Sequence, residues 1–95
     1  MNAENRIVRV GIGYSLDEYN QFKSDLMEIG LDMLLDQYYT RRERYNEYKS
    51  HSKHIHWTEE NEERAMNLIK AVRNEICNRI ENPVCVIDDG NVVPL

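Results

Sequence analysis

The chain of 95 residues contains few of the residues that interrupt regular secondary structure. It has four Gly and two Pro, which excludes collagen-like, linker-rich and low-complexity chains. Its two Cys are too few for a disulfide framework and predict small apolar side chains in a reducing compartment. Because 41% of the residues are hydrophobic and 31% are charged, enough apolar side chains remain for a packed core. The length predicts one domain over residues 1–95, since a second domain would have no core of its own.

Long apolar runs are also missing. The longest wholly apolar runs cover residues 33–35 and 84–87, far short of the roughly 20 residues that a membrane-spanning helix needs. Near the N-terminus, Arg6 and Arg9 surround an apolar stretch that is too short for a secretory signal. We therefore expect no membrane association and a cytoplasmic location, in the host cytoplasm if the protein is virus-encoded.

The absence of Gly and Pro between Gly30 and Pro83 predicts long helices. Ser15 and Glu18 form a capping box that begins a helix at residue 16. This helix ends near Thr40 or continues to Ser50. Its apolar positions are spaced by three and four residues, which predicts one buried stripe. The stripe consists of Tyr19, Phe22, Leu26, Ile29 and Met33.

A second helix is predicted to begin after Thr58, a good N-cap that is followed by several Glu residues. Its stripe contains Ala65, Ile69, Val72, Ile76 and Ile80. Asn82 ends this helix, because a residue that precedes Pro disfavours the helical conformation.

Three segments have the pattern of strands. Residues 6–14 alternate apolar and polar, with Val8, Val10, Ile12 and Tyr14 on one face. Residues 84–87 and 91–93 flank the turn at residues 89–90. The predicted fold class is α+β, with the order β-α-α-β-β: a long helical hairpin packed with a small antiparallel sheet. An uninterrupted first helix would be too long for a compact monomer, so we expect a homodimer or a higher homo-oligomer.

The net charge of −5 is unevenly distributed along the chain. Residues 1–37 and 58–95 are acidic, whereas residues 38–57 contain five basic and two acidic residues. The acidic total argues against general DNA binding. The basic segment also contains four of the six Tyr, the single Trp and all three His.

The basic segment is a candidate ligand-binding site. Guanidinium groups pair with phosphate oxygens, and aromatic rings stack on bases. The candidate ligand-binding residues are Tyr38, Arg41, Arg42, Arg44, Tyr45, Tyr48, Lys49 and His51. The three Arg would hold a phosphate, Tyr45 and Tyr48 would stack on a ring, and Lys49 and His51 would assist. The same residue types are also typical of protein interfaces, so the segment could equally be a seam between two copies.

No motif in the sequence predicts an enzyme or a resident cofactor. Gly11 and Gly13 precede a helix, but acidic residues occupy the helix start where a phosphate would bind. The spacing of His51, His54 and His56 does not match the i, i+4 spacing of a helical zinc site. We therefore expect no catalytic residues, no metal site and no cofactor.

Two functional hypotheses follow from these patterns. The first is a small, non-enzymatic, oligomeric binding protein that captures a phosphate-bearing, nucleotide-like ligand. A virus-encoded protein that sequesters a host nucleotide is one setting that fits this size and composition. The alternative is an inhibitor, immunity-type or regulatory protein that docks on a host enzyme through the basic segment or the acidic face of the first helix.

Overall fold

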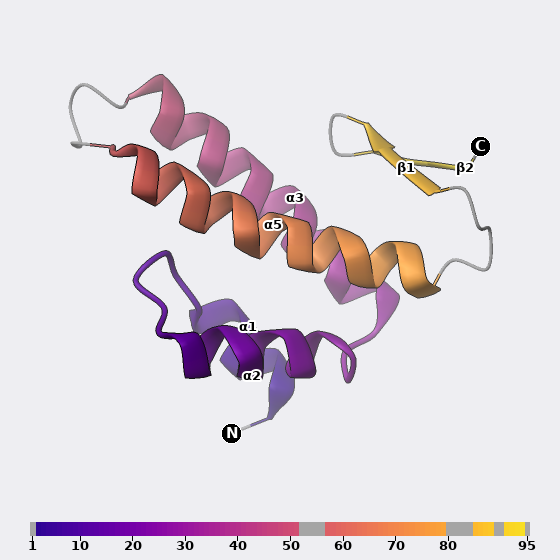
Figure 1. Cartoon of the computed structure of the whole chain (residues 1–95). Coiled ribbons are helices and arrows are strands. Elements are labelled where there is room, and N and C mark those ends of the chain that lie inside the picture. The colour runs from indigo at the N-terminus through magenta and orange to yellow at the C-terminus, as the bar shows by residue number, and fades with distance from the viewer. Residues whose placement is uncertain (1, 52–56, 80–84, 89–90, 95) are drawn as a thin grey trace.

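The computed structural model describes residues 2–51, 57–79, 85–88 and 91–94. The helices are α1 (Ala3–Arg9), α2 (Leu16–Leu26), α3 (Leu31–Ser50) and α5 (Glu59–Arg79). Helices α3 and α5 lie side by side as a helical hairpin, and α1 and α2 lie together on one side of it (Figure 1). None of these helices is both long and apolar enough to cross a membrane.

The predicted α+β fold class is wrong, because the body of the molecule is all-helical. The buried side chains of the described residues belong to the four helices and to the short connection between α2 and α3. After α5, β1 (Cys85–Asp88) pairs with β2 (Asn91–Pro94) in an antiparallel ribbon of two strands. Residues 6–14 do not join this ribbon, so the predicted sheet that unites both ends of the chain is not formed.

The segment predicted as the first strand contains a helix and a turn. Helix α1 begins after Asn2, whose side chain accepts a hydrogen bond from the backbone N–H of Asn5. The core is contacted from this segment by Ala3, Ile7 and Val10, which are spaced as on one face of a helix. The segment therefore follows the helical spacing and not the alternation of apolar and polar residues that predicted a strand. Val8, which the strand prediction placed on the buried face, is half exposed.

The predicted first long helix is two helices. The capping box at Ser15 and Glu18 is confirmed, with hydrogen bonds in both directions between the two residues. However, α2 ends at Leu26, and α3 begins after Gly30, which has an extended ψ of 161°. Phe22, Leu26 and Ile29 of the predicted stripe are buried as expected.

We expected an oligomer because a single helix from residue 16 would be too long for a compact monomer. Since the chain breaks between α2 and α3, no such helix exists and this reason no longer holds. The predicted stripe is divided between the two helices and their connection, and it is buried or partly buried within one chain. Assembly into a homo-oligomer stays a prediction. Helix α3 does continue through the basic segment to Ser50.

Helix α5 follows the sequence pattern closely. The hydroxyl oxygen of Thr58 accepts a hydrogen bond from the backbone N–H of Asn61, as expected for an N-cap. Of the predicted stripe, Ile69, Val72 and Ile76 are buried as expected, whereas Ala65 is half-buried and Ile80 lies outside the described residues. The predicted end of this helix at residues 82–83 lies outside the described residues.

A buried carboxylate joins α1 to α2. Asp25 is 1% exposed and accepts two hydrogen bonds from the guanidinium of Arg6, at 2.8 and 2.9 Å. The side-chain amide of Gln21 donates a third, at 2.8 Å. The hydrogen bonds from Arg6, followed by the one from Gln21, lower the pKa of Asp25 against the opposing effect of burial. This ion pair therefore stabilises the packing of the two short helices.

Substitution of Asp25 by Asn should destabilise the fold at neutral pH. Loss of charged hydrogen bonds should lower the free energy of unfolding by about 1.5–3 kcal/mol. The pKa of Asp25 is lower in the folded chain than in the unfolded chain. The ion pair therefore contributes its full stability above the ordinary Asp pKa of about 4. This contribution is lost as the pH falls through the pKa of Asp25 in the folded chain. Urea denaturation should show a difference from the wild type at pH 7 that shrinks towards pH 2.

The control for this experiment is Asp36→Asn, which removes the same charge from an exposed position on α3. It should leave stability nearly unchanged. An Asp25→Asn variant that is as stable as Asp36→Asn at pH 7 would contradict a stabilising contribution of the ion pair.

Candidate functional site

Arg41 of the basic segment is directed into the fold. It is 8% exposed, and its Nη2 donates to the carbonyl oxygen of Ile7 at 2.7 Å. Its Nη1 donates to the carbonyl of Val10 at 3.0 Å, and its Nε donates to Gln37 at 3.1 Å. The backbone carbonyls at the end of a helix have no partner within the helix, and Arg41 provides donors for one carbonyl in the last turn of α1 and one just after it.

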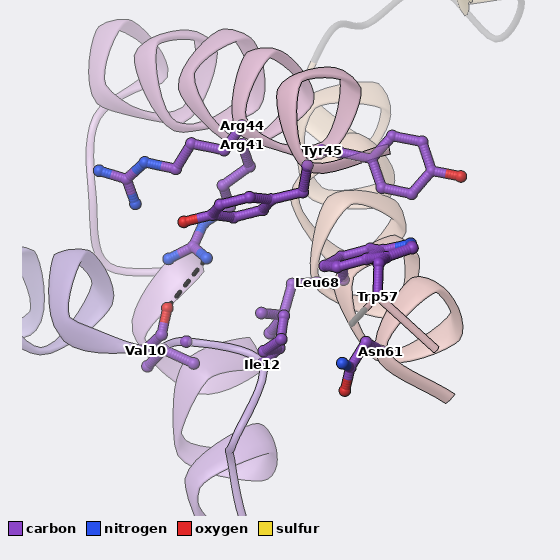
Figure 2. Close-up of a pocket in the computed structure, with 11 residues that line it drawn as sticks. Val10, Ile12, Arg41, Arg44, Tyr45, Trp57, Asn61 and Leu68 are labelled. Carbon is purple, nitrogen blue, oxygen red and sulfur yellow. Dashed lines mark hydrogen bonds between the residues drawn. The ribbon is translucent and has the colours of Figure 1, made fainter. Parts of the chain in front are cut away.

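Arg41 also lines a pocket of about 350 Å³. The pocket lies between the connection from α1 to α2 and the helical hairpin of α3 and α5 (Figure 2). Its walls consist of Val10, Gly11, Ile12, Arg41, Arg44, Tyr45, Tyr48, Trp57, Asn61, Ala65 and Leu68. Four of these are predicted ligand-binding residues, so the structure brings part of the predicted set together.

Two positive charges lie on the same side of this pocket (Figure 2). Burial, followed by the nearby charge of Arg44, lowers the pKa of Arg41 to about 10. Arg41 therefore remains charged at neutral pH. Among the described residues, neither Arg41 nor Arg44 pairs with a carboxylate. Two neighbouring guanidinium groups with no carboxylate partner in the described part of the chain make this side of the pocket electropositive.

Aromatic rings form another wall of the pocket. The rings of Tyr48 and Trp57 are stacked with their centroids 5.6 Å apart. Tyr45 contacts Trp57 edge to face at 6.3 Å. Tyr48 is 44% exposed, so part of this aromatic surface is open to solvent. Such a surface can stack on a planar ring.

A hydrogen-bonded cluster joins α3 to α5 beside the pocket. Glu62 accepts a hydrogen bond from the hydroxyl of Tyr45 at 2.7 Å and one from Lys49 at 3.2 Å. These two hydrogen bonds lower the pKa of Glu62. The charge of Lys49 is therefore paired, which does not favour the predicted contact between Lys49 and a phosphate.

The remaining candidate residues lie outside the pocket lining. Tyr38 is 1% exposed and belongs to the core. The guanidinium of Arg42 lies 6.0 Å from the Tyr38 ring centroid. His51 is exposed, and its Nδ1 lies 2.9 Å from the carbonyl oxygen of Glu47.

The histidine cluster falls mostly outside the described residues, which include neither His54 nor His56. Within the part of the chain that the structure describes, no group of three or more His, Cys, Asp or Glu side chains could hold a metal ion.

The sequence patterns missed most of the pocket walls. Trp57 is the only Trp in the sequence and the last residue of the basic segment, but it was not assigned to the site. Asn61 carried no signal, because an Asn in the first turns of a helix is common on a surface. The segment from Val10 to Ile12 was predicted as part of a strand, and only the tertiary fold carries it to α3 and α5.

Comparisons with known proteins add no relative, because no family model, curated protein or solved structure matches the chain. The function must therefore be argued from the pocket itself.

Arg41 and Arg44 should differ sharply in their effect on stability. Arg41→Met would remove the guanidinium donors to the carbonyls of Ile7 and Val10 and leave the Ile7 carbonyl only the backbone N–H of Val10, which should lower the free energy of unfolding by on the order of 3 kcal/mol. Arg44→Met removes the same charge from an exposed position and should change it by less than about 0.5 kcal/mol. Urea denaturation followed by far-ultraviolet circular dichroism measures both. Equal stability of the two variants would refute the structural contribution of Arg41.

Proposed function

We propose that this chain is a non-enzymatic binding protein that captures a small, phosphate-bearing ligand with an aromatic ring, of nucleotide type. The observation that carries this proposal is the pair of guanidinium groups, Arg41 and Arg44, which line one pocket with no carboxylate partner among the described residues.

The electrostatics of the pocket favour an anion. A buried charge is costly unless it is paired, and burial already lowers the pKa of Arg41. A guanidinium has five N–H donors, of which Arg41 uses three on described residues. An anion placed between Arg41 and Arg44 would accept from the remaining donors and relieve the repulsion between the two cations.

The aromatic wall favours a ring on the same ligand. Tyr48 and Trp57 offer a partly exposed surface beside the two cations. Stacking of a base on an aromatic side chain contributes about 1–3 kcal/mol. A ligand with a planar ring and a phosphate group would use both features at once.

We propose binding without turnover because of the chemistry of the lining. The described lining residues provide cations, aromatic rings, an amide and apolar groups, and they include no His, Cys, Asp or Glu. Proton transfer and nucleophilic attack mostly depend on those residue types. A protein with such a site would sequester or sense its ligand. This proposal agrees with the first hypothesis from the sequence, a non-enzymatic protein that captures a nucleotide-like ligand.

Titration with adenosine nucleotides should quench or shift the fluorescence of Trp57, which is the only Trp in the chain and lines the pocket. We expect Arg44→Ala to weaken binding at least about tenfold, the effect of losing one charged hydrogen bond. Isothermal titration calorimetry of the same samples should give the same order of affinity.

The matched control is Arg73→Ala, on α5, because Arg73 does not line the pocket. It removes the same charge and should leave binding unchanged. If no adenosine nucleotide binds to the wild-type protein, or if the two variants weaken binding equally, the proposed site is wrong.

A further inference from the structure

We infer that the ligand is a nucleoside monophosphate, whose single phosphate lies at Arg41 and Arg44 and whose base edge meets the side-chain amide of Asn61. This inference rests on the proposed function and makes it more specific in two respects. It states that the ligand has one phosphate, and that the side-chain amide of Asn61 hydrogen-bonds to the base.

The size of the pocket limits the ligand. Its volume of about 350 Å³ is near the lower end of the range for small-molecule sites, about 300–1,000 Å³. One base with its sugar and one phosphate is in keeping with such a volume. A dinucleotide or a longer strand would extend well beyond it.

The distribution of charge limits the number of phosphates. Arg41 and Arg44 are the only cationic side chains among the described lining residues. Lys49, the nearest further candidate from the sequence, is paired with Glu62 at 3.2 Å. A second or third phosphate would therefore leave its aqueous environment without a further cation among the described lining residues to receive it, at a cost in binding.

Asn61 provides a polar group on the opposite side of the pocket from the two Arg. Figure 2 shows Asn61 below Trp57, across the pocket from Arg41 and Arg44. Its backbone N–H is bound to Thr58, but its side-chain amide has no hydrogen-bond partner among the described residues. An Asn amide carries an acceptor and two donors side by side, which match the adjacent donor and acceptor on the edge of a base.

These features lie at two sides of the pocket. The cations lie at one side, and Trp57 and the amide of Asn61 lie at the other. A nucleoside monophosphate likewise carries an anion at one end and a planar base with a hydrogen-bonding edge at the other.

The test is a titration of Trp57 fluorescence with AMP, ATP and phenyl phosphate. Phenyl phosphate carries one phosphate and a ring without a hydrogen-bonding edge. AMP should bind at least about tenfold more tightly than either of the others, because phenyl phosphate lacks the base edge and ATP carries two further phosphates that no cation of the described lining receives.

Two variants separate the parts of the site. Asn61→Leu should weaken AMP binding by about tenfold and leave phenyl phosphate binding unchanged, because only the base edge loses its partner. Arg44→Ala should weaken both ligands. The matched control is Asn74→Leu, an exposed Asn on the same helix, which should change neither.

The outcomes distinguish this inference from the proposed function. If none of the three probes binds, the proposed function itself fails. If ATP binds as tightly as AMP, or if Asn61→Leu affects AMP and phenyl phosphate equally, the pocket remains a nucleotide site but the assignment of a monophosphate read by Asn61 is overturned. Thermal denaturation of each variant confirms that it is folded before the titration is interpreted.

Discussion

The fold depends on arginine side chains that donate to backbone carbonyls far away in the sequence. Arg41 binds the carbonyls of Ile7 and Val10, Arg64 those of Ile12 and Tyr14, and Arg79 those of Leu26 and Ile29. All three arginines belong to α3 or α5, and all six carbonyls lie at the ends of α1 and α2 or in the connections that follow them. A helix end leaves its last carbonyls unpaired, and two short helices in 30 residues produce many such groups.

These contacts compensate for the small share of the buried core that α1 provides. α1 contributes only Ile7 to the fully buried core. A helix of seven residues is marginal by itself, and it gains stability when Arg41 binds the carbonyls of Ile7 and Val10. Around Tyr14 the arrangement is similar, because Arg64 also lies 4.1 Å from the Tyr14 ring centroid.

The same interactions shape the pocket. The segment from Val10 to Ile12 forms one wall, and it is held by Arg41 at one end and by Arg64 at the other. Arg41 therefore stabilises the wall and supplies positive charge to the space beside it. The basic segment as a whole contributes less charge to the pocket than its composition suggests, because Lys49 is paired with Glu62 and Arg42 lies beside Tyr38. Arg44 is the exposed cation of the lining.

The sequence alone was sufficient for the features that depend on residues within about four positions of one another. The capping box at Ser15, the N-cap at Thr58 and the buried stripe of α5 are of this kind, since a helix joins neighbours at three and four residues. The gathering of Arg44, Tyr45 and Tyr48 on α3 followed from the same spacing. Only the tertiary structure decided that the chain turns at Gly30, that residues 3–9 are helical, and that Arg41 is directed inward. Each of these depends on a donor or a packing surface 31 to 53 residues away, and no local pattern records which distant side chain will satisfy a given carbonyl.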